Sequence, residues 1–233
     1  MSTCDDIQKE VKDILKTDWK RRDGTVVPEA ESVKLGNDAV CLKGTVLYAD
    51  LADSTALVKG YKDWFAAEIY KSYLLSMCRI IRLNNGVITA FDGDRVMAVF
   101  IGDSKDPAAA KTGLMINYVV QNIINKAIKD QYPTTGFQIQ QAVGIDSSDL
   151  FIARTGIRGS NDLVWVGRAA NYAAKLCSLR EASYATYISD NVFAGLNEQT
   201  WYGGTTRTMM WEKVMWNEQG IPVYRSSWWW KPD

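Results

Sequence analysis

Histidine is absent from this chain of 233 residues. Its absence excludes zinc sites with imidazole ligands, devices in which histidine activates a serine or cysteine nucleophile, and an imidazole general base. Any catalysis must therefore rest on carboxylates, on lysine or arginine, on the backbone or on a bound metal ion.

Long apolar runs are also absent. None approaches the ~18 residues of a membrane span, because Arg79, Arg82 and Arg95 interrupt the longest apolar segments. The polar, acidic start of the chain is unlike a signal peptide. Basic and acidic residues number 27 each. The chain therefore lacks the excess of positive charge that is typical of nucleic-acid-binding proteins. We therefore expect a cytoplasmic protein with neither a membrane span nor a nucleic-acid partner.

Cysteines are few and scattered, with no CxxC motif and no close pair; they are Cys4, Cys41, Cys78 and Cys177. This spacing is typical of reduced thiols rather than of a metal or redox site. We expect the four side chains to be buried.

Hydrophobic spacing predicts alternating helices and strands. Helical spacing predicts helices over 3–20, 61–83, 107–130 and 168–179. Short apolar or alternating runs predict strands over 46–50, 87–91, 96–101, 137–145, 150–154, 163–166 and 187–189. Asp92-Gly93 is a hairpin signal between two of these strands, and a loop is expected over 20–37. The order β-α-β-β-α-β indicates an α+β fold, a ferredoxin-like sandwich with added elements.

This pattern divides the chain into three expected segments. They are an N-terminal helix and connector over 1–37, a core domain over 38–195 and a C-terminal extension over 196–233 that packs on the core. Six of the nine tryptophans lie between Trp201 and Trp230. We interpret them as covering a sheet edge or a subunit surface, since gathered apolar side chains of this kind mark contact surfaces.

Asp50 and Asp94 are the first candidates for a functional site. In a β-α-β-β-α-β sheet the first and third strands are antiparallel neighbours, so the end of the first, at Asp50, lies beside the start of the third, at Asp94. Two carboxylates held together repel each other, and a divalent cation relieves that repulsion. The pair therefore predicts a metal site, although each aspartate taken singly also suits a turn or a helix cap.

The loop after the first aspartate is the second candidate. Leu51, Ala52, Asp53, Ser54 and Thr55 lead into a helix, and small residues there let backbone N–H groups face an anion. A phosphate chain that bridges this loop and the metal site is the expected ligand. The chain has no GxxxxGK[ST] motif, which excludes a P-loop.

Three segments resemble the motifs of the class III adenylate and guanylate cyclases. Segment 44–55 reads GTVLYADLADST and resembles the first metal motif; segment 86–100 reads GVITAFDGDRVMAVF and resembles the second. Segment 164–176 reads VWVGRAANYAAKL and resembles the family's helix with an asparagine and, four residues later, an arginine. Each motif is weak alone, but their order and spacing are specific.

The resemblance implies a homodimer with active sites at the subunit interface. Asp50, Asp94 and the Leu51 carbonyl would hold two Mn²⁺ or Mg²⁺ ions. Asn171 of the partner subunit would orient the ribose, and Lys175 would meet the phosphates. In the implied reaction the substrate's own 3′-hydroxyl attacks its α-phosphate and pyrophosphate leaves. One ion acidifies the hydroxyl and the other stabilises the leaving group.

Two positions that usually read a purine depart from the family pattern. Ala90 stands four residues before the second metal aspartate, where the family has Lys or Glu, and Val164 stands seven before Asn171, where it has Asp, Cys or Ser. Neither side chain can pair with the polar edge of a base. Tyr48 lies two residues before Asp50, on the same strand face. Its hydroxyl would shorten the pocket and bind a smaller pyrimidine, although a core role for Tyr48 stays open.

This combination resembles the Pycsar pyrimidine cyclases of bacterial anti-phage defence, which make cyclic UMP or cyclic CMP as an alarm signal. The hypothesis is a uridylate cyclase that converts UTP to cyclic UMP; a cytidylate cyclase is the alternative, and the residues do not decide between them. A nucleotide-binding sensor without activity is the rival of another class. A diguanylate cyclase is disfavoured because its GG[DE]EF turn is missing.

Three basic residues near these motifs have two interpretations. Lys175 stands in place of the family's arginine and keeps the charge without the two-pronged geometry, so it is either a phosphate contact or a solvated surface residue. Arg95 and Arg168 are possible auxiliaries, and we treat both as exposed arginines.

Overall fold

The computed structural model describes residues 2–181 and 183–232. The chain divides into two compact units, the first made of residues 1–43 and 149–167 and the second of residues 44–148 and 168–233. Two long strands, β2 (Asp38–Leu51) and β5 (Gln141–Ile157), contribute residues to both units. This division does not test the three segments expected from the sequence, whose boundaries stay predictions.

The first unit contains α1 (Thr3–Lys16), β1 (Lys20–Asp23), the 3-10 helix η1 (Ala30–Ser32) and β6 (Ser160–Val166). Helix α1 begins at a capping box, in which Ser2 and Asp5 each bond the other's backbone N–H. β1 runs parallel to β2, with Lys20 opposite Asp38. The segment predicted as a loop over 20–37 therefore contains a strand, which its four exposed, charged residues concealed.

The second unit is built on a mixed sheet. Its strand order is β10 (Glu212–Trp216), β11 (Ile221–Ser226), β7 (Thr186–Ser189), β5, β2, β4 (Arg95–Phe100) and β3 (Val87–Asp92). β5 and β7 are parallel, whereas β2 and β3 each pair with β4 in antiparallel fashion. Helix α3 (Asp63–Leu83) follows β2, and α4 (Lys105–Val119) follows β4. These elements confirm the predicted α+β class.

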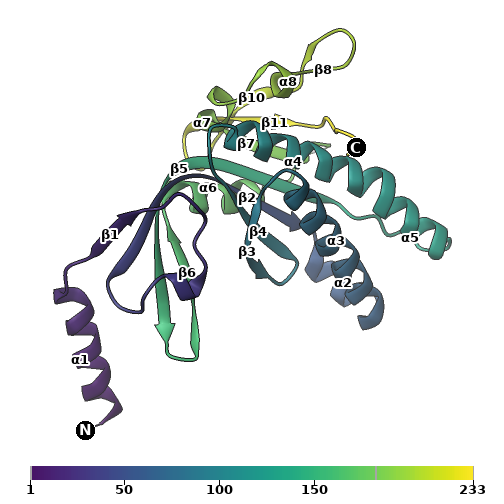
Figure 1. Cartoon of the computed structure of the whole chain (residues 1–233). Coiled ribbons are helices and arrows are strands. Elements are labelled where there is room, and N and C mark those ends of the chain that lie inside the picture. Colours follow the sequence, from purple (N-terminus) through teal and green to yellow (C-terminus); the bar gives the residue numbers. More distant parts are fainter. Residues whose placement is uncertain (1, 182, 233) are drawn as a thin grey trace. The chain divides into compact units, whose positions relative to one another are not determined.

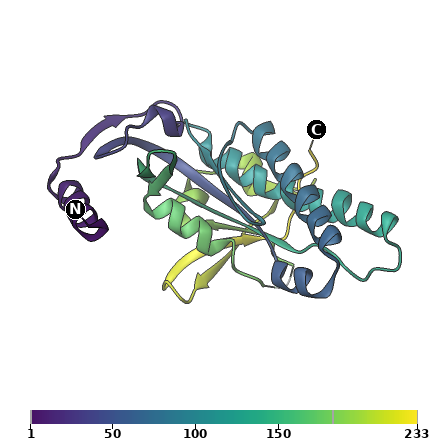
Figure 2. The same ribbon diagram turned by 90° about the horizontal axis from the view of Figure 1, so that it is seen from below.

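Helices cover both faces of this sheet (Figures 1 and 2). α3 and α4 pack on the face that carries Leu47 and Ala49 of β2. α6 (Arg168–Leu176) packs on the other face, where it approaches β5 so closely that a Cβ atom at Gly144 would lie 2.2 Å from the carbonyl oxygen of Ala173. Because side chains alternate between faces, Asp50 belongs to the α6 face.

The predicted strand over 137–145 is shorter than expected, since β5 begins only at Gln141. In the preceding segment the Ile139 N–H donates to Asn125 Oδ1 at 2.7 Å instead of to a strand. Phe137 packs edge-on against Phe65, with ring centroids 5.6 Å apart. The first half of the alternating run therefore packs on helices, and only its second half, from Gln141, pairs in the sheet.

The second predicted long helix is interrupted at its middle. A π-helical turn, η2 (Val120–Ile124), joins α4 to α5 (Asn125–Gln131). The remaining elements are α2 (Ser54–Gly60), α7 (Asp190–Ala194), α8 (Glu198–Trp201), β8 (Tyr202–Gly203) and β9 (Thr208–Met209).

The tryptophan-rich tail belongs to the second unit. β10 and β11 extend its sheet beyond β7, and Trp216 of β10 is buried. The chain then runs along α4: Trp228 O accepts from Asn117 Nδ2 at 2.9 Å, and the Trp230 N–H donates to Leu114 O at 3.0 Å. Part of this aromatic cluster therefore covers helix α4, in addition to the sheet edge or subunit surface that we expected it to cover.

Among the described residues no helix is long and apolar enough to cross a membrane. The four cysteines are free, and Cys177 is the buried one; Cys41 and Cys78 are partly exposed and Cys4 is exposed. The expectation of four buried thiols is therefore wrong. Cys4 lies on α1, a helix that buries none of its residues.

Candidate active site

Asp50 and Asp94 lie where β2 ends and β4 begins. In the antiparallel pairing of these strands Asp50 is opposite Arg95, the residue after Asp94. The β3–β4 hairpin pairs Asp92 with Arg95, so its turn consists of Gly93 and Asp94, with Gly93 at a φ of +62°. The turn lies one residue further along the chain than predicted, and it carries the second carboxylate.

The surroundings of Asp50 disfavour its charged form, and one oxygen of Asp94 lacks a partner among the described residues. Burial raises the pKa of Asp50, and the negative charge of Asp94 raises it further, whereas Arg180 and Arg95 lower it. Arg180 Nη2 donates to Asp50 Oδ2 at 3.2 Å. Asp94 Oδ2 is buried and has no hydrogen-bond partner among the described residues. A buried carboxylate oxygen of this kind is costly unless a cation binds it.

This donor set fits Mg²⁺ or Mn²⁺. Both ions prefer carboxylate and carbonyl oxygens, which Asp50, Asp94 and the backbone of Leu51 can supply. In the described part of the chain no three His, Cys, Asp or Glu side chains gather as a metal-binding group. An ion here would therefore need further oxygen ligands, and Mg²⁺ sites of nucleotide-dependent enzymes take them from substrate phosphates and water.

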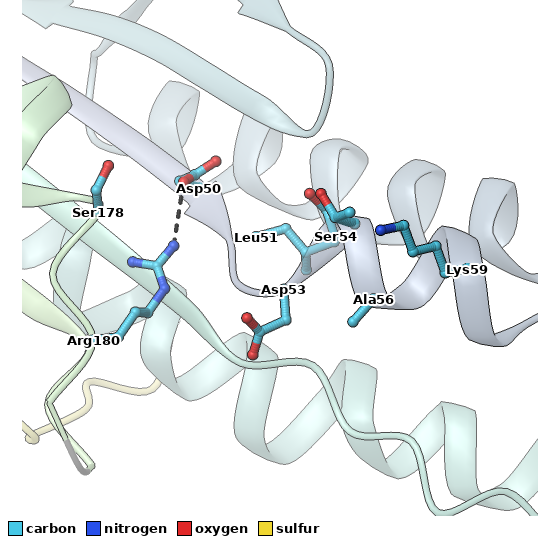
Figure 3. A pocket seen from close by; sticks show the side chains of 9 residues that line it. Asp50, Leu51, Asp53, Ser54, Ala56, Lys59, Ser178 and Arg180 are labelled. Carbon is cyan, nitrogen blue, oxygen red and sulfur yellow. Dashed lines mark hydrogen bonds and ion pairs between the residues drawn. The ribbon is translucent and has the colours of Figure 1, made fainter.

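A pocket of about 530 Å³ opens beside Asp50 (Figure 3). It is lined by Asp50, Leu51, Asp53, Ser54, Thr55, Ala56, Lys59, Ser178 and Arg180. Its volume is within the ~300–1,000 Å³ typical of ligand pockets. Ala52 is not part of the lining: its side chain is buried and its N–H already donates to Gln140 O at 2.8 Å. The predicted phosphate loop thus lines the pocket except at Ala52.

Tyr48, Met97 and Ala90 are paired neighbours on β2, β4 and β3. Paired residues of adjacent strands point to the same face, which here is the face of Asp50. Tyr48 is half-buried, and burial raises the pKa of its phenol. The Arg95 guanidinium lies 5.3 Å from the centre of the Tyr48 ring. The structure thus gives Tyr48 the strand face that the sequence predicted.

Asn171 and Lys175 are exposed on α6, and neither lines the pocket beside Asp50. Residues four apart share one side of a helix, so the two lie on the same exposed side of α6. Val164 belongs to the first unit, where it pairs with Ala153 and is 39% exposed. The second unit therefore provides the two aspartates and their pocket, while the predicted ribose and phosphate contacts lie on an open helix surface.

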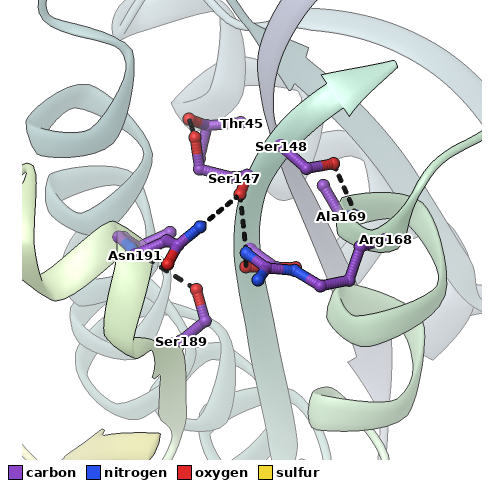
Figure 4. A network of polar contacts seen from close by, with 9 residues as sticks. Thr45, Ser147, Ser148, Arg168, Ala169, Ser189 and Asn191 are labelled. Carbon is purple, nitrogen blue, oxygen red and sulfur yellow. Dashed lines mark hydrogen bonds and ion pairs between the residues drawn. The ribbon is translucent and has the colours of Figure 1, made fainter. Parts of the chain in front are cut away.

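An ion pair fixes the first turn of α6, within a network of polar contacts (Figure 4). Arg168 donates to both carboxylate oxygens of Asp146 at 3.0 Å. Asp146 is fully buried, and the Ala169 N–H donates to Ser148 Oγ at 3.0 Å. Arg168 is exposed, as expected, and its contact with Asp146 also positions the helix that carries Asn171.

Three residues near the aspartates carry no functional signal in the sequence. Arg180 and Lys59 line the pocket but belong to no motif. Tyr73 of α3 is fully buried, and its hydroxyl has no hydrogen-bond partner in the described residues. Burial raises the pKa of Tyr73 well above its ordinary value, and the charge of Asp50 adds to this. Its helical spacing indicated a core residue, and only the fold reveals how near the carboxylates it lies.

Comparison with known proteins finds close relatives over the whole chain. A uridylate cyclase from Xanthomonas perforans is 46% identical over 100% of both chains. A uridylate cyclase from Burkholderia cepacia is also 46% identical, over 99% of each chain. Among solved structures, the adenylyl cyclase CyaB from P. aeruginosa has a TM-score of 0.65 at 20% identity, over 81% of this chain and 95% of that one. No protein-family model matches the chain.

Proposed function

The chain belongs to the family of uridylate cyclases, and we propose that it converts UTP to 3′,5′-cyclic UMP and pyrophosphate. The observation that carries this proposal is the pair of aspartates at one sheet edge. Within the described residues the buried Oδ2 of Asp94 has no hydrogen-bond partner, and Asp50 lines a pocket of nucleotide size. The full-length similarity to uridylate cyclases supports UTP over CTP as the substrate.

Asp50, Asp94 and the Leu51 carbonyl would hold two Mg²⁺ or Mn²⁺ ions. When bound, these ions acidify the 3′-hydroxyl and neutralise the charge of the leaving pyrophosphate. The chain's own residues bind and orient the substrate. The wall formed by 53–55 receives the phosphates, and the pocket holds them in line for attack. The bond from the 3′-oxygen to the α-phosphorus forms as the bond to pyrophosphate breaks, and the hydroxyl proton is released.

Tyr48 is the proposed reader of the pyrimidine. Its hydroxyl is a hydrogen-bond donor and acceptor, and it lies on the strand face that carries Asp50. Ala90, two strands away in the same row, presents no polar side-chain atom to a purine. A pyrimidine ring suits this combination, because a longer purine would need a polar contact that Ala90 lacks.

The product identity tests the proposal. Purified protein incubated with UTP and Mn²⁺ is expected to release one pyrophosphate for each cyclic UMP, identified by mass spectrometry. Cyclic CMP formed from CTP at the higher rate would favour the cytidylate alternative. Binding of nucleotide without any cyclic product would favour the inactive sensor.

We further propose that the enzyme works as a homodimer, with Asn171 and Lys175 reaching the site of the partner subunit. Both side chains are exposed on α6, outside the pocket of their own chain. Asn171→Ala and Asp50→Asn variants should each be inactive alone. Mixed and allowed to exchange subunits, they should recover about a quarter of the wild-type rate, because half of the dimers are mixed and each has one intact site of two.

Subunit exchange must be verified in the same sample, for example by native mass spectrometry of two differently tagged variants. Mixed dimers that stay inactive would contradict a site shared between subunits.

The proposed setting is the bacterial cytoplasm, where nucleoside triphosphates are made. The cyclic UMP would act there as a second messenger in anti-phage defence.

A further inference from the structure

Arg180 lies on the loop that follows α6 and is held by three contacts. Its Nη2 donates to Asp50 Oδ2 at 3.2 Å. Its Nη1 donates to the backbone oxygen of Leu179 at 3.0 Å and to that of Cys177. Figure 3 shows the guanidinium extended from its loop toward Asp50, at the wall of the pocket. No motif of the sequence includes this residue, and the reaction derived above does not use it.

The contact with Asp50 occupies an oxygen that a metal ion would use. Arginine stays protonated at any physiological pH, so its positive charge cannot be removed and can only move. A metal ion and a guanidinium close to one carboxylate oxygen repel each other. Binding of an ion to Oδ2 of Asp50 therefore requires Arg180 Nη2 to leave that oxygen, and an ion on either oxygen weakens the attraction of Arg180 for the carboxylate.

The pocket offers the displaced guanidinium a new partner. Arg180 shares the pocket wall with Lys59, Ser54 and Thr55, which are hydrogen-bond donors suited to an anion. The two contacts of Nη1 to backbone oxygens keep the group at this wall even when the Asp50 contact is lost. A planar guanidinium pairs with two oxygens of a phosphate at once, which a lysine does not.

We propose that Arg180 neutralises Asp50 in the substrate-free enzyme and binds the triphosphate of the substrate once a metal ion has taken its place on Asp50. This rests on the proposed function. Arg180 would supply, from the same subunit as the aspartates, the bidentate phosphate contact that a lysine such as Lys175 cannot form. The exchange also keeps the buried site close to charge balance both before and after the ion binds.

The first test is Mn²⁺ binding to the nucleotide-free protein, measured by calorimetry. Arg180→Gln removes the competing charge, so its Mn²⁺ affinity should rise about tenfold. Arg180→Lys keeps the charge and should stay near the wild type. Arg158→Gln, which changes an exposed arginine in the β5–β6 turn, is the matched control and should not alter Mn²⁺ binding. Unchanged or weaker Mn²⁺ binding by Arg180→Gln would overturn the exchange.

The second test is the KM for UTP at saturating Mn²⁺. Arg180→Gln should raise it by about tenfold or more, since the variant loses a charge-assisted hydrogen bond to phosphate. The KM of Arg180→Lys for UTP should fall between those of the wild type and of Arg180→Gln. A normal KM for UTP in Arg180→Gln would refute the phosphate contact while leaving the cyclase proposal intact. Failure of the wild type to make cyclic UMP would refute the cyclase proposal, and the nucleotide-free Mn²⁺ titration would still decide whether Arg180 exchanges with the ion.

Discussion

Replacing Asp50 with asparagine should abolish cyclisation and, in metal-free buffer, make the protein more stable. The expected loss of kcat is about 10³-fold or more, because an amide is a poor metal ligand and a bound ion contributes several kcal/mol of transition-state stabilisation. The expected gain in stability follows from the raised pKa of Asp50, whose causes are burial and then the charge of Asp94.

The sign of the pH dependence follows from that raised pKa. A carboxyl group whose pKa is higher in the folded state favours folding at low pH, and that contribution is lost as the pH rises through the folded-state pKa. The stability advantage of Asp50→Asn should therefore be absent at acidic pH and should grow as the pH rises through the folded-state pKa of Asp50. Each 1 kcal/mol gained would raise the Tm by about 2–4 °C for a chain of this size.

Thermal unfolding in EDTA across this pH range measures the effect. Asp103→Asn is the matched control, since Asp103 is an exposed carboxylate in the turn after β4. This control should keep both activity and Tm. Mn²⁺ should stabilise the wild type and the control but not Asp50→Asn. A destabilised Asp50→Asn at neutral pH, or one that retains activity, would contradict the assignment of Asp50 as a metal ligand.

Removing the Tyr48 hydroxyl should weaken the choice of base while leaving the reaction possible. Tyr48→Phe keeps the ring, and with it the neighbouring Arg95 contact, but loses the proposed hydrogen bond to uracil. The kcat/KM for UTP should fall about 10- to 100-fold, since leaving a buried polar group of the base unpaired costs ~1–3 kcal/mol. The rate with ATP should change little, so the preference for UTP over ATP should narrow.

Steady-state rates with UTP and ATP, each measured separately, give the required ratio. Tyr61→Phe is the control. Tyr61 is 39% exposed and stacks on Phe65 with ring centroids 5.0 Å apart, and it is not among the paired strand residues Tyr48, Met97 and Ala90. A UTP-to-ATP preference that is the same in Tyr48→Phe and in the wild type would make Tyr48 a core residue without a role in base recognition.

Local signals account for the parts of the fold that the sequence predicted. The Asp-Gly signal and the flanking apolar runs produce the β3–β4 hairpin, displaced by one residue. Helical spacing predicted a helix over 61–83, and α3 runs from Asp63 to Leu83. The chain leaves the helix through Asn85, which has the left-handed conformation common after helix ends. Because these elements are right, their topology places Asp50 opposite Arg95, and the two aspartates follow from the order of strands alone.

Contacts between distant segments account for what the sequence did not reveal. Arg180 meets Asp50 across 130 positions, and no local pattern encodes such a meeting. β1 is made of charged, exposed residues and forms only because β2 offers it an edge. Arg168 is exposed, as the sequence suggested, but its partner, the buried Asp146, lies 22 positions earlier and is revealed only by the fold. Side-chain partners of this kind depend on packing, whereas periodicity reports only which face is buried.

The most direct measurement is a competition between the four nucleoside triphosphates. Purified wild-type protein is incubated with equimolar ATP, GTP, CTP and UTP and with Mn²⁺, and the cyclic products are quantified by mass spectrometry. Cyclic UMP should be the main product, and it should vanish in Asp50→Asn. A mixture dominated by cyclic AMP or cyclic GMP, or the absence of any cyclic product, would contradict a uridylate cyclase at this pair of aspartates.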